Sequence, residues 1–158
     1  MTRSKYAIIT EVCPRDGFQS ISESVPTETK VEIINALIAC GFPQLEVTSF
    51  VHPKAIPQLK DADEVLTKIN RSKDVKLRAL VPNVRGLERA IAAGVDKVKL
   101  MLSASDSHSL SNANCTTLEA LAQYEPVIVH ANEAGMGVSG SISVAFGCPY
   151  EGDIPVER

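Results

Sequence analysis

The chain has 158 residues, enough for one ordinary α/β domain but fewer than the roughly 250 residues of a complete (β/α)₈ barrel. Its 16 basic and 19 acidic residues give a net charge of −3, and aromatic residues make up only 4%, so nothing favours a nucleic-acid partner. Hydrophobic residues make up 44%, but no apolar run approaches the roughly 18 residues of a membrane-spanning helix, so we expect no membrane partner either.

Apolar runs of strand length alternate with amphipathic stretches in the first half of the chain. We expect one strand over residues 6–13 and another over 45–50, because mostly apolar runs of this length are typical of strands buried on both faces. A helix is expected between them, with Thr27 as its N-cap and Gly41 at its end. Asp61 is expected to cap the next helix.

The same alternation continues in the second half. Three further strands are expected, over residues 75–81, 97–102 and 138–146. Asn83 is placed to cap a helix, and Thr116 and Glu119 form a capping-box pattern at the start of a longer helical stretch. Pro126 lies inside that stretch and predicts a kink or two helical pieces. Two segments are expected to be loops, 103–112 and 147–153.

The four cysteines contain no C-x-x-C pair, so a structural zinc site is not expected. Without a secretion signal they are typical of reduced thiols, which favours the cytoplasm, with the mitochondrial matrix after leader removal left open. We expect most of these thiols to be buried, including Cys40 on the helix before Gly41.

Five strands and four helices in strict alternation imply a parallel sheet with right-handed crossovers. Composition does not distinguish an open doubly wound sheet from part of a (β/α)₈ barrel. The first strand is not followed by G-x-G-x-x-G, and no Walker-type loop is present, so a nucleotide-binding sheet has no positive support. In either architecture the functional residues follow the carboxyl ends of the strands.

Two charged positions stand out at these strand ends. Asp16 could hold a hard divalent cation, and the neighbouring Arg15 could neutralise negative charge developing on an oxygen. The same residues also fit ordinary turn chemistry. Glu46 lies in an apolar strand, where a carboxylate needs a partner, and Arg15 is the candidate. Alternatively, Glu46 points to the sheet edge or a helix.

The segment 11–19, EVCPRDGFQ, resembles the first-strand signature of the metal-dependent TIM-barrel lyases and synthases that share an R-D-G-x-Q motif. Within this superfamily the chain is similar to the 3-hydroxy-3-methylglutaryl-CoA lyases. The supporting stretches run in family order: VPTETK at 25–30, EVTSFVHPK at 46–54, SAS at 103–105, NANC at 112–115 and GCPYEG at 147–152.

The resemblance implies cleavage of an acyl-CoA substrate, 3-hydroxy-3-methylglutaryl-CoA, to acetoacetate and acetyl-CoA by a retro-Claisen reaction. It also implies a divalent metal cofactor, Mg²⁺ or Mn²⁺, with Asp16 as a ligand. Arg15 would bind substrate and stabilise the enolate, and Glu46 would orient Arg15 or the metal-bound water. Gln19 and Ser49 would lie against the substrate.

The resemblance further implies an incomplete barrel. The family's H-x-H metal ligands, a later Asn and a Gly-rich loop with a reactive Cys have no counterpart in these 158 residues. The implied fold class is α/β, of the parallel (β/α)₈ TIM-barrel family with about five βα units. Residues 1–158 would form the N-terminal part of a single catalytic barrel domain, inactive by itself.

Two other functions stay open. One is a synthase of the same superfamily that condenses acetyl-CoA with a 2-oxo acid, and the other is a non-catalytic truncated module. The unpaired strand edges of an incomplete barrel predict self-association, so we expect a homo-oligomer.

Overall fold

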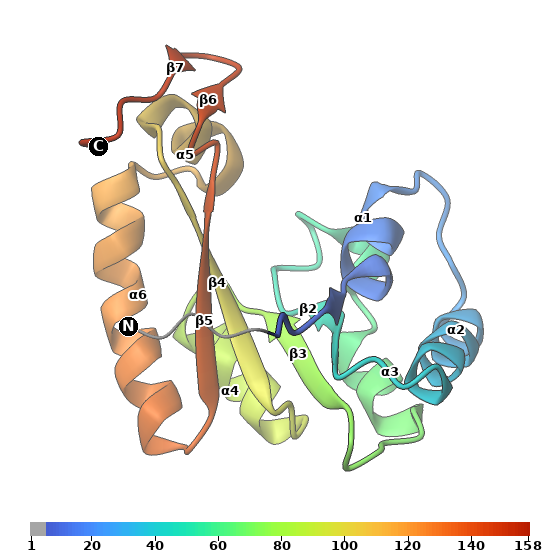
Figure 1. Cartoon of the computed structure of the whole chain (residues 1–158). Coiled ribbons are helices and arrows are strands. Elements are labelled where there is room, and N and C mark those ends of the chain that lie inside the picture. The colour runs from blue at the N-terminus through green and yellow to red at the C-terminus, as the bar shows by residue number, and fades with distance from the viewer. Residues whose placement is uncertain (1–5) are drawn as a thin grey trace.

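A five-stranded parallel sheet forms the centre of the computed structural model, which describes residues 6–158. Its strands are β1 (Thr10–Glu11), β2 (Gln44–Ser49), β3 (Lys76–Leu80), β4 (Lys97–Ser103) and β5 (Gly137–Ser143). They lie side by side in chain order, and each neighbouring pair is parallel (Figure 1). A doubly wound sheet reverses its strand order at a switch point. The unbroken order identifies a barrel-type sheet.

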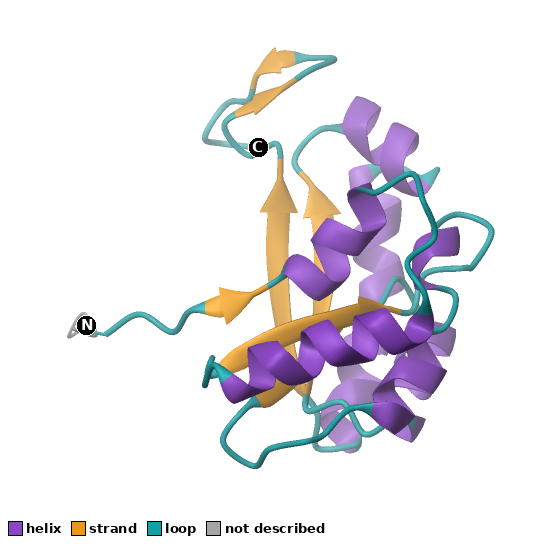
Figure 2. Ribbon diagram, turned by 90° about the vertical axis from the view of Figure 1, so that its right-hand side faces the viewer, coloured by secondary structure: helices purple, strands orange, loops and turns teal. Residues whose placement is uncertain are grey.

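The helices lie on one side of this sheet (Figure 2). They are α1 (Phe18–Ser20), α2 (Thr27–Ala39), α3 (Ala62–Lys68), α4 (Val84–Ala92), α5 (Asp106–Ala113) and α6 (Thr117–Glu133). Among residues 6–158, none of the helices has the length and apolarity needed to cross a bilayer. A short antiparallel hairpin of β6 (Gly147–Cys148) and β7 (Gly152–Asp153) follows β5.

The apolar core fills the layer between the helices and the sheet. Ile34 of α2, Leu66 of α3 and Leu87 of α4 are almost completely buried in one cluster with Leu45 of β2 and Val98 of β4. Burying each such side chain contributes about 1.5–3 kcal/mol of hydrophobic free energy. The helices are therefore held to one face, and the other face is left for polar side chains.

That other face is concave. Arg78 of β3 donates hydrogen bonds to the hydroxyl oxygens of Thr10 on β1 (3.1 Å) and Ser139 on β5 (2.7 Å). In a flat sheet β1 and β5 would lie roughly 19 Å apart, because neighbouring strands are spaced by about 4.8 Å. One guanidinium reaches both strands only because the sheet curls around it. The curl and the strand order confirm the predicted incomplete (β/α)₈ barrel.

The predicted caps of α4 and α6 are confirmed. The Asn83 side chain accepts the backbone N–H of Gly86 at 3.0 Å. Thr116 and Glu119 form a reciprocal capping box at the start of α6. The predicted division of α6 is wrong, because the helix is continuous from Thr117 to Glu133 with Pro126 inside it. Pro126 lies on the solvent side of the helix, where water can satisfy the carbonyl group that loses its partner.

The predicted roles of Thr27 and Asp61 as helix caps are wrong. Neither side chain caps its helix, and Pro26 occupies the N-cap position of α2. Instead, the Thr27 hydroxyl donates to Asp61 Oδ2 (2.8 Å), and Lys30 Nζ donates to Asp61 Oδ1 (2.7 Å). A buried ammonium group is a stronger partner for this carboxylate than a backbone N–H.

Three further expectations differ from the structure. The segment 103–112 is not a loop, because Ser105 accepts the His108 N–H and begins α5. The segment 147–153 forms the β6–β7 hairpin. Cys40 is exposed at the C-cap of α2, where the helix ends in solvent.

Candidate active site

A π-helical turn over Cys13–Gly17 follows β1, so the predicted strand over 6–13 is reduced to two residues. Glu11 causes part of this change, because its Oε1 accepts the backbone N–H groups of both Val12 and Cys13 at 2.7 Å. Those N–H groups are then unavailable to a strand ladder. Gly17 keeps the turn tight, since a Cβ there would lie 3.1 Å from Cys13 Sγ. The turn places the Arg-Asp pair of the motif at the carboxyl end of β1.

Arg15 forms the centre of the charged cluster. Its side chain is 7% exposed, with Nε donating to Glu46 Oε1 (2.7 Å) and Nη1 donating to Asp16 Oδ1 (2.6 Å). Glu46, from β2, is 1% exposed, and its carboxylate lies between Arg15 and Lys99 of β4, so it points neither to the sheet edge nor to the helix layer. The Asp16 carboxylate is 59% exposed at the mouth of the sheet. The structure thus brings together the three charged residues that the sequence singled out.

A second cation reaches Glu46 from the opposite side of the concave face. Lys99 Nζ, from β4, lies 3.7 Å from Glu46 Oε2, and the Lys99 side chain is 17% exposed. A buried carboxylate is stable as an anion only when it is paired. Glu46 satisfies this requirement with Arg15 on one oxygen and Lys99 near the other.

Sequence reasoning missed Lys99, although the sequence contained a signal for it. Lys97, Lys99 and Met101 alternate with the buried Val98 and Leu100 along β4. Alternate residues of a strand share a face, so this pattern places both lysines opposite the core. The pattern does not say which of them reaches Glu46.

Gln19 and Ser49 make no hydrogen bond to the charged cluster within residues 6–158. Gln19 lies on α1, one turn beyond Asp16, and is half-buried. Ser49 is buried at the end of β2, where its hydroxyl oxygen accepts the backbone N–H of Val51 (3.2 Å). Both residues follow the carboxyl ends of the first two strands, and their contact with substrate stays a prediction.

The carboxyl end of β4 is fastened to the β6–β7 hairpin. The Ser105 hydroxyl donates to Cys148 Sγ (2.9 Å), and Cys148 is 6% exposed. Burial raises the pKa of the Cys148 thiol, but hydrogen bonds from Ser105 and from the backbone N–H groups of Tyr150 and Glu151 together lower that pKa below its ordinary value. Because the sulfur is buried, these contacts position the hairpin rather than present a nucleophile.

A divalent metal fits this site only in part. Asp16 offers an exposed carboxylate whose Oδ1 pairs with Arg15, and carboxylate oxygens are the kind of ligand that Mg²⁺ and Mn²⁺ prefer. Nowhere in residues 6–158 do three His, Cys, Asp or Glu side chains gather into a cluster that could hold a metal ion. The described residues can therefore supply one ligand but not a complete coordination shell.

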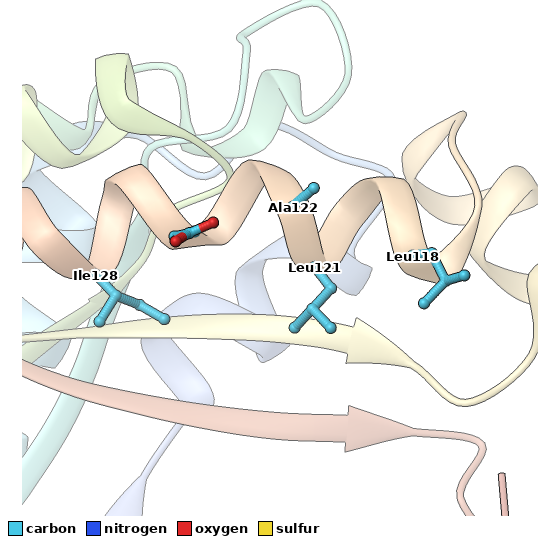
Figure 3. Close-up of a pocket in the computed structure, with 5 residues that line it drawn as sticks. Leu118, Leu121, Ala122 and Ile128 are labelled. Atoms are coloured by element: carbon cyan, nitrogen blue, oxygen red, sulfur yellow. The ribbon is translucent and has the colours of Figure 1, made fainter.

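A shallow apolar groove lies on α6 and does not belong to this site. It is lined by Leu118, Leu121, Ala122, Glu125 and Ile128. Leu118, Leu121 and Ile128 project from the same side of the helix (Figure 3). Leu118 is 76% exposed and Leu121 is 52% exposed, so this side of α6 is not covered by the described residues.

A barrel-type parallel sheet, with an Arg-Asp pair at the end of its first strand and a buried Glu on its second, is the arrangement expected of the TIM-barrel lyases and synthases. The model of the HMGL-like family matches residues 7–158, and the chain belongs to this family.

The similar proteins and solved structures include several hydroxymethylglutaryl-CoA lyases. The chain is 45% identical over 150 residues to the mitochondrial hydroxymethylglutaryl-CoA lyase of Arabidopsis thaliana, covering 95% of this chain and 32% of the relative. The crystal structure of the Bacillus subtilis HMG-CoA lyase superposes with a TM-score of 0.94 at 43% identity, covering 99% of this chain and 53% of that one. An HMG-CoA lyase from Acinetobacter baumannii, in complex with coenzyme A and 3-methylmalate, gives a TM-score of 0.91 at 39% identity, covering 95% and 49%. The chain therefore spans between about a third and a half of the length of these relatives.

Proposed function

We propose that residues 1–158 supply the first part of a 3-hydroxy-3-methylglutaryl-CoA lyase active site, within one barrel domain. The observation that carries the proposal is the buried Arg15–Glu46 ion pair, with Asp16 beside it at the mouth of the sheet. The similarity to hydroxymethylglutaryl-CoA lyases over almost the whole chain supports this choice over a condensing synthase.

The proposed reaction breaks the bond between C2 and C3 of the substrate. The tertiary hydroxyl at C3 loses its proton as its oxygen becomes the ketone oxygen of acetoacetate. The electron pair of the broken bond moves to the thioester, giving the enolate of acetyl-CoA, and a proton then adds at the enolate carbon. The protein must therefore stabilise negative charge on the thioester oxygen in the transition state.

Arg15 is placed to provide that stabilisation. Its Nε and Nη1 are oriented by Glu46 and Asp16, which leaves Nη2 available for a substrate oxygen. Because Glu46 is almost fully buried, the guanidinium is fixed before the substrate arrives, and little reorganisation is needed during the reaction. We infer that Gln19 and Ser49 contact the acyl-CoA at the same mouth.

We propose Asp16 as one ligand of a Mg²⁺ or Mn²⁺ ion whose other ligands come from outside these 158 residues. When bound, such an ion would act as a Lewis acid on substrate oxygens. The open edge of β5 and the uncovered apolar side of α6 support a barrel domain that continues beyond the described βα units.

The sharpest test joins this chain to the region of the Bacillus subtilis lyase that lies beyond the matched part. Acetoacetate release from 3-hydroxy-3-methylglutaryl-CoA is measured with added Mn²⁺, for this chain alone and for the chimera. We expect activity in the chimera and not in the chain alone. A parallel assay with acetyl-CoA and a 2-oxo acid, following release of free CoA thiol, tests the condensing synthase.

Variants of the chimera test the site itself. Arg15→Ala and Glu46→Gln should each abolish cleavage, whereas Glu64→Gln, which changes a carboxylate on the exposed side of α3, should leave it unchanged. Circular dichroism shows whether each variant folds. A folded chimera that stays inactive, or one that keeps its activity without Arg15, would contradict the proposal.

A further inference from the structure

Lys99 is a charged group on the concave face, beside Glu46, to which the proposed reaction gives no task. It extends from β4 and lies two strands away from Glu46, yet the curl of the sheet brings its Nζ to 3.7 Å from Glu46 Oε2. That distance allows an ionic attraction but is too long for a hydrogen bond. An ammonium group carries three N–H donors, and none of them has an acceptor among residues 6–158.

The position of Lys99 in the sheet places it nearer the carboxyl ends of the strands than the row of Glu46. Register pairs put Lys99 in one row with Ser49 on β2, Leu80 on β3 and Ser139 on β5. Glu46 belongs to the preceding row, with Arg78, Lys97 and Gly137, so Lys99 lies two residues of β4 nearer the carboxyl ends of the strands than the row of Glu46. Lys97, two residues earlier on the same face, pairs with Arg78 and Gly137 and so shares the row of Glu46.

Glu46 uses the charge of Lys99 but not its hydrogen-bonding capacity. Glu46 Oε1 already accepts a charge-assisted hydrogen bond from Arg15 at 2.7 Å, which is the stronger of its two ionic contacts. Among residues 6–158 the concave face also has an excess of positive charge, because Arg15, Arg78, Lys97 and Lys99 stand against Glu46 and Asp16. This excess occurs in a chain whose net charge is −3, so the face favours an anionic ligand.

The acyl group of the proposed substrate carries two oxygen groups that a cation would stabilise. One is the thioester oxygen, which becomes negative during cleavage and is assigned to Arg15. The other is the free carboxylate at the far end of the acyl chain, which is negative throughout. Lys99, on β4 and thus across the concave face from Arg15, is a separate cation that could bind this carboxylate.

We propose that Lys99 binds the free carboxylate of the acyl group and so makes this protein specific for acyl-CoA substrates that carry a terminal carboxylate. The proposal rests on the proposed lyase function. Lys99 then acts as a specificity-determining residue, with ammonium donors that Glu46 does not use.

Binding to two non-reacting acyl-CoAs tests the proposal without relying on turnover. Glutaryl-CoA carries the terminal carboxylate and butyryl-CoA lacks it, so the ratio of their dissociation constants, measured by calorimetry, reports carboxylate recognition. The assay uses the full protein that carries this sequence, together with Lys99→Met and Lys99→Gln as two neutral variants. Lys97→Met is the matched control, since it removes the same charge from the same face of β4, and Lys99→Arg retains the charge.

We expect the wild-type protein to prefer glutaryl-CoA, and Lys99→Met to reduce that preference by about 10-fold or more, because one partner of a sheltered charge pair is lost. Lys97→Met should leave the ratio unchanged, and Lys99→Arg should retain most of it. If the wild-type protein cleaves 3-hydroxy-3-methylglutaryl-CoA and both neutral variants keep the full preference, the Lys99 proposal alone is wrong. If the wild-type protein binds neither acyl-CoA, the lyase function and this proposal are both overturned.

Discussion

The ion pair between Lys30 and Asp61 fastens α2 to α3, and it allows a test of the fold that needs no activity. The Lys30 side chain is 4% exposed and that of Asp61 is 12% exposed. Lys30 Nζ donates to Asp61 Oδ1 at 2.7 Å and to the Gln58 carbonyl oxygen at 2.5 Å. Replacing Lys30 with Met keeps the length of the side chain but removes the charge and both hydrogen bonds. The Asp61 carboxylate is then left with the Thr27 hydroxyl at 2.8 Å.

The expected cost of Lys30→Met follows from this burial. Removing one partner of a buried ion pair costs about 3–5 kcal/mol, mostly because the other charge stays buried without compensation. Asp61 is reached by some water, which screens its charge, so the expected loss lies near the lower end, at about 3 kcal/mol. For a protein of marginal stability this is a large fraction of the free energy of unfolding.

Urea unfolding followed by circular dichroism measures this loss. Lys68→Met is the matched control, since Lys68 is paired with Glu28 and Glu64 but is 39% exposed on the surface of α3. The midpoint of Lys30→Met should fall well below that of the wild type, with little change in slope, whereas Lys68→Met should stay close to the wild type. Equal midpoints for the two variants would refute the argument that burial makes the Lys30 pair important.

The same pair predicts a pH dependence. Burial raises the pKa of Asp61, but hydrogen bonds from Lys30 and Thr27 together with the Lys30 charge lower it by more, so the folded pKa lies below its ordinary value of 3.8. A carboxylate with a lowered folded pKa stabilises the fold fully above its unfolded pKa and loses that contribution as the pH falls through the folded value. The difference in unfolding free energy between the wild type and Asp61→Asn should therefore be constant near neutral pH and shrink below about pH 3.8.

Three further variants test the site and the helix caps. In an active protein, Arg15→Lys should lower kcat by at least about 100-fold while Mn²⁺ affinity, measured by electron paramagnetic resonance, stays nearly unchanged, because an ammonium lacks the guanidinium fork that bridges Glu46 and the substrate. Asp16→Ala should weaken Mn²⁺ binding by about 10-fold or more, and an unchanged affinity would exclude Asp16 as a ligand. Asn83→Ala should lower the free energy of unfolding by about 1 kcal/mol in a urea titration, since the Gly86 N–H loses its acceptor.

The alternation of strands and helices could be predicted because it is local. Each strand after the first lies within or overlaps its expected range, and the Asn83 and Thr116 caps were identified from residue type and spacing alone. The length of the first strand was overestimated, for a reason that the pattern of apolar residues does not show. The Glu11 carboxylate competes for the N–H groups of the next two residues, and Pro14 has no N–H to offer a ladder. The apolar composition of residues 6–13 therefore predicted a longer strand than the backbone hydrogen bonds allow.

In the charged cluster, one ion pair of Glu46 could be predicted from the sequence and the other could not. The pairing of Glu46 with Arg15 could be predicted, because a carboxylate in an apolar strand needs a cation and parallel strands bring their ends together. The approach of Lys99 could not, since β4 lies two strands from β2 and a flat sheet would hold them roughly 10 Å apart. The lysine must also lean across β3, and the strand pattern does not show whether Lys97 or Lys99 does so. The Arg15–Glu46 pair thus follows from strand order and composition, whereas the contribution of Lys99 depends on the tertiary arrangement of the sheet.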